Sequence, residues 1–584
     1  MRRERKSPPR VAAAPTPARG FSRLGPWLII GAAVLAVSAP VIVHPALPIG
    51  SDIYATMHYV EGFRKAFSEG DLLPRWTDRT NQNLGGPSFV LFPPCFYYLA
   101  AGASGIAGSD IAGVRLAIVI LSLLTALSFH LMAREWIGPG LAAAAATALY
   151  LVLPYHVLDI YQRFAMSESA AFVFFPLILL FARRLLEGGG GLDFAGLAVA
   201  YAGLIATHLV SAFAFSLFLG AFMIWEGRGR LRSLATTAAA LACGVGLASP
   251  VLLPAMIEKS YVNVQWVREA PNADFRNNFI FRDDPIPGLG FKDPVKPPVV
   301  KSAHSQLLLA GVAAAIALAG LGDDERRRRA VKALAAACGI AYLLQLEITT
   351  PIWKIVPELA TIQFPWRFQM IMVLTAAGLS GLALHAARSQ SHAKGWAPRA
   401  GFTPALTVLG VVAAVNVLLG AQNALLKPFV FDEAALEVPG VIDWVDPTLT
   451  PVEYTAYRDI RRIRLEFPRA AFTEGKGEVT VRRWLSSTRA LDIRSEEGGT
   501  VLVRSFWFPG WTATLDGTPL SIGSAPPYGA VSFRAPPGAH VVEMRFEPTP
   551  LRRGAAWTGV AFVGVTAGLA LVSFRRSVRT PEAA

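Results

Sequence analysis

Long apolar runs recur along almost the whole chain and constrain its fold more than any other feature. Most are about 17 to 22 residues long, enough for an α-helix to cross the roughly 30 Å hydrocarbon core of a bilayer. Overall 53% of the residues are hydrophobic and only 16% are charged, which is too apolar for an ordinary soluble protein. The sequence therefore predicts an α-helical polytopic membrane protein with twelve spans, at about 26–44, 111–132, 138–154, 168–183, 192–208, 210–225, 233–256, 303–321, 333–347, 367–387, 402–421 and 554–574.

A further apolar run at 92–108, "FPPCFYYLAAGASGIAG", is interrupted by Pro and Gly and carries paired tyrosines. These residues suit the headgroup level of a bilayer, so we expect an interfacial or re-entrant helix. The alternative is a thirteenth span.

The positive charge gathers in short tracts between the apolar runs. The net charge is +14, but no nucleic-acid-binding module accompanies it, so the sequence argues against a nucleic-acid partner. Basic tracts beside membrane spans mark cytoplasmic loops. With twelve spans and the N-terminus inside, every tract falls on that side: the N-terminal decapeptide, Arg183-Arg184, 227–232, 323–332, 388–399 and 575–579. We expect a plasma (inner) membrane protein with both termini cytoplasmic, tails at 1–25 (disordered) and 575–584, and an uncleaved first span.

The opposite side receives four outer segments, 45–110, 155–167, 257–302 and 348–366, which complete a helical domain at 26–421. It also receives a region of different character, residues 422–553. Short alternating runs such as "GEVTVRRW" and "TVLVRSFWF", separated by Gly, Pro and Asp-Gly turns, predict an antiparallel β-sandwich. The span at 554–574 then anchors its C-terminal end. The three cysteines, Cys95, Cys243 and Cys338, are too scattered for a disulfide framework or a metal cluster, and we interpret them as packing residues.

Ionisable residues concentrate on the outer side, where they are functional candidates because charge is costly near a bilayer. Asp52 follows the first span directly, and Arg163 and Arg367 present guanidinium groups suited to a phosphate. A pocket that holds these groups beside the lipid would fit a lipid-phosphate substrate. Other candidates for substrate binding are His58, Arg75, Glu168, His208 and Arg268, and Asp78 is a candidate second acid.

Each candidate also has a plainer interpretation. Asp52 follows Ser51 at a helix start and would serve as an N-cap. Arg163 and Glu168 would form a structural ion pair, Arg367 would extend to the headgroups, and His208 would hydrogen-bond between helices. His58 and Glu61, near Asp52 on the same helix, would be solvated interface residues.

Five stretches together resemble a bacterial membrane family named after 6-pyruvoyl-tetrahydropterin synthase, which is similar to YfhO-like proteins and to the GT-C glycosyltransferases. They are "SDIYATMHYVEGFRKAFSEGDLLPRW", "GGPSFVLFPPCFYYLA", "PYHVLDIYQRFAMSESAAF", "THLVSA" and "IQFPWRF". The terminal "FPGWTATLDG" and "PPGAHVVEMRFEP" resemble the outer domain of YfhO-like proteins. The sequence has no zinc-binding trio of histidines, so we expect no pterin chemistry despite the family's name.

The GT-C resemblance implies a glycosyltransferase that takes a sugar from a polyprenyl phosphate on the outer face, for a glycan, lipid or protein acceptor of the cell envelope. The acid after the first span, here Asp52, would be the general base, with inversion at the sugar. Arg163 and Arg367 would stabilise the departing phosphate, with Arg75 and Arg268 behind them, and Asp78 would assist the acceptor or hold a divalent cation. The loop lacks a tight DxD motif, so we assign no metal ligand. Two alternatives remain: a flippase or transporter of a lipid-linked sugar, and a non-catalytic accessory protein of envelope glycan assembly, in which Trp507, Trp511 and Tyr528 would stack on sugars.

Overall fold

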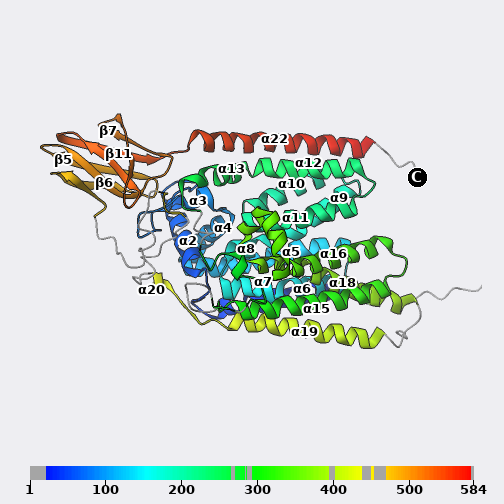
Figure 1. Ribbon diagram of the computed structural model, residues 1–584. Coiled ribbons are helices and arrows are strands. Elements are labelled where there is room, and N and C mark those ends of the chain that lie inside the picture. Colours follow the sequence, from blue (N-terminus) through cyan, green and yellow to red (C-terminus); the bar gives the residue numbers. More distant parts are fainter. Residues whose placement is uncertain are drawn as a thin grey trace, which may run out of the picture.

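The computed structural model describes residues 21–264, 270–282, 284–285, 293–393, 402–436, 449–452 and 468–579. These residues form a bundle of long, roughly parallel helices with a β-sandwich at one end (Figure 1). We call this end the sandwich end and the opposite one the basic end.

Nine helices of the described residues are long and apolar enough to cross a membrane. Three of these spans include a break or a short 3₁₀ or π turn: α6–α7–η1 at Leu141–Arg163, α8–α9 at Met166–Leu186, and Pro365–Ser389, which joins η6 to α18. The elements that build the nine spans are α1 (Phe21–Val43), α5 (Asp110–Trp136), α6 (Leu141–Val152), α7 (Pro154–Leu158), η1 (Asp159–Arg163), α8 (Met166–Ala171), α9 (Phe174–Leu186), α11 (Leu209–Glu226), α15 (Lys296–Gly320), η6 (Pro365–Phe368), α18 (Gln369–Ala393), α19 (Phe402–Leu425) and α22 (Pro550–Arg579).

Three of the expected spans differ from straight, full-length helices. α12 (Leu231–Leu247) continues into α13 (Ser249–Ile257) through a 70° bend, where Pro250 lacks the N–H that a continuous helix needs. α16 (Glu325–Leu343) meets a segment that includes α17 (Thr350–Ile355) at 91°, and α10 (Gly191–Ile205) has only 15 residues. The described chain thus has nine spans, or eleven if each bent pair is one, against the twelve predicted. The run at 92–108 forms α4 (Cys95–Ala107), a 13-residue helix.

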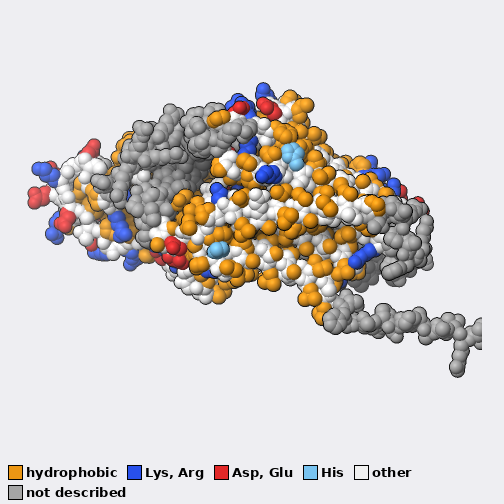
Figure 2. All heavy atoms as spheres, turned by 90° about the horizontal axis from the view of Figure 1, so that it is seen from below, with side chains coloured by type: hydrophobic (Ala, Val, Ile, Leu, Met, Phe, Trp, Pro, Cys, Tyr) orange, Lys and Arg blue, Asp and Glu red, His pale blue; other side chains and the backbone are white. Residues whose placement is uncertain are grey.

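The predicted class, a polytopic helical protein, is confirmed, and several of the basic tracts within the described residues share one end of it. The α9–α10 and α11–α12 turns and the C-terminal end of α22 all lie at the basic end (Figure 1). Between the two ends hydrophobic side chains dominate the surface (Figure 2). On α19, for example, Val411 is 58% exposed and Leu418 69%. Such an apolar belt fits contact with lipid tails.

The strands from Ala470 to Phe546 form two antiparallel sheets. One has the order β3-β6-β10-β9 and the other β4-β5-β11-β7-β8. Alternate residues such as Leu491, Val503 and Val542 point into a shared core between the sheets. The strands are β3 (Ala470–Gly475), β4 (Glu478–Trp484), β5 (Thr488–Ser495), β6 (Gly499–Phe506), β7 (Trp511–Leu515), β8 (Thr518–Leu520), β9 (Gly523–Ala525), β10 (Ala530–Ala535) and β11 (Gly538–Phe546).

The region predicted to be a sandwich begins at residue 422, but its first described part, which follows α19, is not part of the two sheets. Its strand β2 (Phe429–Phe431) pairs with β1 (Leu47–Pro48), just before Asp52. The sandwich itself rests on the segment that follows α2 (Ile53–Ser68). Trp76 from this segment packs on Trp511 with ring centroids 5.3 Å apart, and the Ser486 N–H donates to Glu69 Oε2 over 2.7 Å. Trp511 is therefore a packing residue.

Candidate functional site

A cluster of buried charges lies in the bundle toward the sandwich end, and an irregular turn builds its centre. After α7 the backbone widens into the π-helical turn η1 and ends at Phe164, whose φ of 59° is unusual for a residue with a side chain. Strained turns of this kind persist only where surrounding contacts hold them, and they concentrate at functional sites. The turn places Asp159 and Arg163 beside Glu168 of α8.

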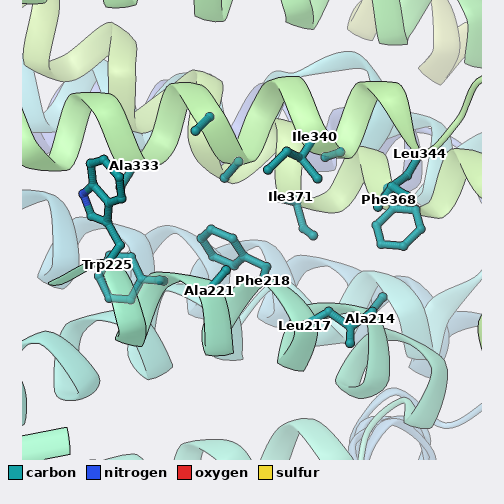
Figure 3. Close-up of a pocket in the computed structure, with 14 residues that line it drawn as sticks. Ala214, Leu217, Phe218, Ala221, Trp225, Ala333, Ile340, Leu344, Phe368 and Ile371 are labelled. Atoms are coloured by element: carbon teal, nitrogen blue, oxygen red, sulfur yellow. The ribbon is translucent and has the colours of Figure 1, made fainter. Parts of the chain in front are cut away.

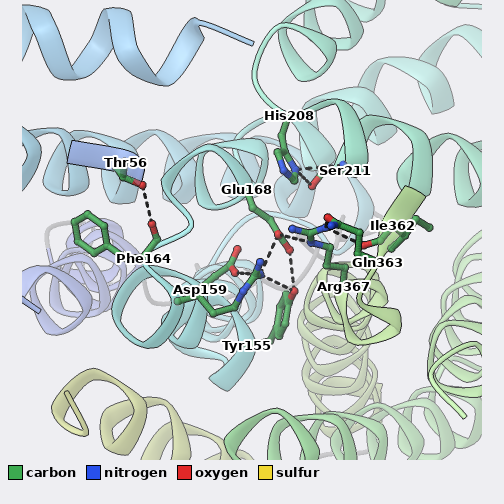
Figure 4. A network of polar contacts seen from close by, with 11 residues as sticks. Thr56, Tyr155, Asp159, Phe164, Glu168, His208, Ser211, Ile362, Gln363 and Arg367 are labelled. Atoms are coloured by element: carbon green, nitrogen blue, oxygen red, sulfur yellow. Dashed lines mark hydrogen bonds and ion pairs between the residues drawn. The ribbon is translucent and has the colours of Figure 1, made fainter. Parts of the chain in front are cut away.

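Glu168 is the hub of this cluster (Figure 4). Its Oε2 accepts from Arg163 Nη1 over 2.9 Å and from Arg367 Nε over 3.1 Å, and its Oε1 accepts from the Tyr155 hydroxyl over 2.8 Å. Arg163 Nη1 also donates to Asp159 Oδ1 and to the Tyr155 hydroxyl. Arg163 and Glu168 do form the ion pair that the plainer interpretation predicts, but the pair is one part of a network joining three segments of the chain. We call Tyr155, Asp159, Arg163, Glu168 and Arg367 the ion cluster.

Each of the two arginines, Arg163 and Arg367, has guanidinium N–H groups that make no hydrogen bond within the described residues. Every hydrogen bond of the Arg163 side chain there uses Nη1. Arg367 uses Nε for Glu168 and Nη1 for the Ile362 carbonyl and Gln363 Oε1. N–H groups on both guanidiniums thus remain available for an anion. Arg367 is 8% exposed, so it is a buried member of the cluster and does not extend to the headgroups.

Asp52 is attached to this cluster through the backbone. Its N–H donates to the Arg163 carbonyl over 2.7 Å, and the Ser51 N–H donates to the Gln162 carbonyl over 3.2 Å. One turn later, Thr56 Oγ1 donates to the Phe164 carbonyl over 3.3 Å (Figure 4). The path is so tight at Gly50 that a Cβ there would lie 2.6 Å from Phe164 Cβ. The start of α2 is therefore held against the Arg163 turn.

The Asp52 side chain has no capping role in the described structure. Asp52 occupies the N-cap position of α2, but its carboxylate makes no capping hydrogen bond there. The residue is half-buried. Burial raises the pKa of its carboxyl, and the charges of Arg163 and Arg367 act in the opposite direction. A carboxylate with a raised pKa, close enough to two arginines to sense their charge, is suited to accept a proton.

His208 borders the cluster from the start of α11. Its Nδ1 accepts from the Ser211 N–H over 3.3 Å and lies 2.7 Å from Ser211 Oγ, so it caps this helix. Burial lowers the pKa of His208 to about 4, against the pull of Glu168, so the ring is neutral at pH 7. The acceptor role of Nδ1 assigns its proton to Nε2.

Two other candidates from the sequence, Asp78 and Arg75, have partners outside the ion cluster. Asp78 is buried and pairs with Lys65 near Arg489 of β5, so it belongs to the contact with the sandwich. Arg75 donates to the carbonyls of Phe89 and Pro250 over 2.8 and 3.1 Å. Arg268 lies outside the described residues.

For His58 and Glu61 the plainer interpretation of the sequence predicts solvated interface residues. That interpretation is wrong for His58, which is 3% exposed on α2. Glu61 pairs with Arg79 over 3.2 Å.

The sequence did not single out two members of the ion cluster, Tyr155 and Asp159, or Gln363, which accepts from Arg367. Asp159 is one of the charged residues of the outer segment 155–167, but nothing in the local sequence indicates that a π turn would aim it inward. Asp293, from the outer segment 257–302, is close enough for its charge to raise the pKa of Asp52 further. Across the described residues no group of three or more His, Cys, Asp or Glu side chains is placed to hold a metal ion.

Spanning helices, a sandwich at one end and a buried ion cluster toward that end define a polytopic membrane protein with a polar site in its bundle. The chain belongs to the family described as the 6-pyruvoyl-tetrahydropterin synthase related domain, a membrane protein family, whose sequence profile matches residues 89–422. The predicted resemblance to this family is thereby confirmed. A search of curated proteins finds no match.

Several solved structures are similar at a distance. The Archaeoglobus fulgidus oligosaccharyltransferase is 15% identical with a TM-score of 0.45, covering 74% of this chain and 61% of its own. The mycobacterial arabinofuranosyltransferase AftD is 18% identical with a TM-score of 0.44, covering 70% and 27%. ArnT from Cupriavidus metallidurans, bound to undecaprenyl phosphate, is 14% identical with a TM-score of 0.30, covering 64% and 80%. The chain thus spans less than two thirds of the first two proteins, and likenesses this distant assign no activity.

Proposed function

We propose that the protein is a membrane glycosyltransferase that moves a sugar from a polyprenyl-phosphate donor to an envelope glycan, lipid or protein on the outer face. One observation carries the proposal. The carboxylate of Asp52 does not cap α2, and burial raises its pKa. The Asp52 backbone is hydrogen-bonded to that of Arg163, and the charges of Arg163 and Arg367 act on the carboxylate. Base and cations therefore meet at one place, although they come from three distant parts of the sequence.

The reaction follows from these roles. Asp52 takes the proton of an acceptor hydroxyl as the hydroxyl oxygen attacks the anomeric carbon of the donor sugar. The attack comes from the face opposite the phosphate, so the bond to the phosphate oxygen breaks with inversion. The departing polyprenyl phosphate gains negative charge, which the remaining N–H groups of Arg163 and Arg367 stabilise. Glu168 positions both guanidiniums, because its Oε2 accepts a hydrogen bond from each of them.

Transfer by membranes that contain the protein tests this proposal. Labelled polyprenyl-phosphate sugars and an acceptor extract are given to wild type, to Asp52→Asn and to Asp71→Asn. We expect Asp52→Asn to slow transfer by about 10²- to 10⁴-fold, the range of a lost general base. Asp71 is a matched control, since it lies in the same outer segment and its carboxylate caps a local turn by accepting from the Leu73 N–H.

Each other outcome points to a different conclusion. If the wild type transfers no sugar but moves lipid-linked sugar across the bilayer, the protein is a flippase. If it does neither, it is an accessory protein. If Asp52→Asn transfers at the wild-type rate, the enzyme stands and the base is another residue.

A further inference from the structure

An apolar groove of about 370 Å³ runs between α11 and α16, with α18 behind it (Figure 3). All fourteen residues that line it are apolar. Ala214, Phe222 and Ala341 are buried at its floor, whereas Leu217 is 46% and Ile340 56% exposed at its rim. The groove is therefore open along its side. Because α11 is a spanning helix and α16 is part of a bent span, that open side faces the membrane.

Small side chains create the groove. Six alanines line it, among them Ala221 on α11 and Ala336 and Ala337 on α16. Where two helices face each other through alanine, the space that larger side chains would fill stays open. From Ala214 to Trp225 the wall on α11 is about 16 Å long at 1.5 Å per residue. A groove of this length suits an extended hydrocarbon chain.

One end of the groove leads to the ion cluster. Phe368 lines it at that end and directly follows Arg367 in the chain. The α11 wall begins one turn after the His208–Ser211 cap. At the far end lies Trp225, whose ring is covered by the Arg228 guanidinium at 4.2 Å. Apolar groove and cations thus follow one another in the order of a lipid tail and its phosphate.

We infer that this groove binds the isoprenoid tail of a polyprenyl phosphate, with the phosphate directed to Arg367. The inference rests on the proposed function for the identity of the head group. It assigns tail recognition to the alanines of α11 and α16, and it makes Trp225 the residue at which the bound part of the tail ends. The tail beyond Trp225 stays in the bilayer.

Photolabelling of the full-length protein in lipid nanodiscs tests the groove. The probe is a long-chain polyprenyl phosphate with a diazirine in the isoprene unit that would lie beside Trp225. We expect the label on peptides of α11 and α16. Ala337→Phe fills the groove and should weaken binding of the long-chain probe by about tenfold or more, because the tail loses its buried area. Ala561→Phe, the same change at an exposed position of α22, should leave binding unchanged.

A short competitor keeps the test independent of folding. Geranyl phosphate is too short to reach the middle of the groove, so its binding should be equal in wild type and Ala337→Phe. Loss of both ligands in Ala337→Phe would mean that the variant has damaged the protein; Trp225→Ala then decides, since it should extend labelling past position 225 without weakening the probe. Unchanged labelling in Trp225→Ala would overturn the inference.

Two further results separate the groove from the proposed function. A diazirine phosphatidylglycerol that labels α11 and α16 equally well and displaces the probe would overturn the inference, because the groove would be a general lipid site. If sugar transfer proceeds while the probe labels other helices, the groove assignment fails alone. If the probe labels the groove but no sugar is transferred, only the proposed function fails.

Discussion

At the scale of single residues, the site depends on how Asp52 balances burial against attraction. Burial disfavours its charged form, and the two arginines favour it, with the net effect of a raised pKa. A carboxyl group with this balance lowers the stability of the fold when it is ionised. Such a cost is typical of residues kept for chemistry.

This balance predicts the effect of Asp52→Asn on stability. Because the folded pKa lies above the unfolded one, the stabilising contribution of Asp52 is complete at low pH and is lost as the pH rises through the folded pKa. At pH 7.5 the amide should therefore match or raise the melting temperature of the purified protein, and the difference should vanish in acid. Thermal unfolding across pH measures it. A lower melting temperature at pH 7.5 would show that attraction to the arginines exceeds the cost of burial.

Asp516 supplies the control of opposite sign. The Val541 N–H and His540 hold the pKa of its carboxyl below the usual range. Its contribution is present above the unfolded pKa and is lost as the pH falls through the folded pKa. Asp516→Asn should therefore lower the melting temperature at pH 7.5.

At the scale of elements, the start of α2 and the η1 turn act as one unit. Backbone hydrogen bonds join Ser51 and Asp52 to Gln162 and Arg163, so the backbone segments that carry Asp52 and Arg163 are held together. On the other side, Gln162 Nε2 donates to the Asn423 carbonyl of α19 over 2.5 Å. The unit is thereby connected to the helix that leads to β2.

The close approach at Gly50 predicts that even one methyl group disturbs this unit. A Cβ would come within 2.8 Å of the Arg163 carbonyl carbon as well as meeting Phe164, so the two segments must separate. Gly50→Ala should reduce transfer by about 10²-fold, the effect of a displacement near 1 Å, with normal expression. Gly102→Ala on α4, where nothing lies within 4 Å, is the control. Transfer at the wild-type rate in Gly50→Ala would show that the separation of Asp52 and Arg163 is not critical.

At the scale of the whole molecule, the described basic tracts and the β-sandwich lie at opposite ends of the helical bundle. We propose that the basic end is cytoplasmic and that the sandwich end lies outside, because basic loops are retained inside. The sandwich rests on the segment after α2 through Trp76 and Trp511, and a buried pair between Arg552 Nε and Glu258 Oε2, 2.8 Å apart, connects α22 to the end of α13. The sandwich thus stays close to the outer segments.

Cysteine accessibility tests this orientation. In a variant with Cys95, Cys243 and Cys338 replaced, Glu497→Cys lies in an exposed turn of the sandwich and Arg232→Cys is exposed at the basic end. A membrane-impermeant maleimide added to intact cells should label position 497 and not position 232, and both should react after lysis. The reverse pattern would invert the topology.

Periodicity and charge in the sequence determined the class of this protein. A continuous apolar run long enough to cross a bilayer satisfies its backbone hydrogen bonds there by forming a helix. Short runs of alternating apolar and polar residues, separated by turn residues, predict the strands of a sandwich. Both features could therefore be predicted from the local sequence. The bends at Pro250 and after α16 could not, because the length of an apolar run does not say whether its axis is straight. Nor could the pairing of residues 429–431 with the first outer segment.

Asp52, Arg163, Glu168 and Arg367 could be nominated from the sequence as costly charges at helix ends, but their grouping was decided by tertiary structure. A π turn aims Asp159 and Arg163 inward, and a close contact at Gly50 brings Asp52 to them. Asp78 and Arg75 carry the same chemical groups and lie in the same outer segment as Asp52. Asp78 nevertheless pairs with Lys65 at the contact with the sandwich, and Arg75 donates to backbone carbonyls. Ionisable groups reveal their type in sequence, whereas their partners depend on which segments the packed helices bring within hydrogen-bond distance.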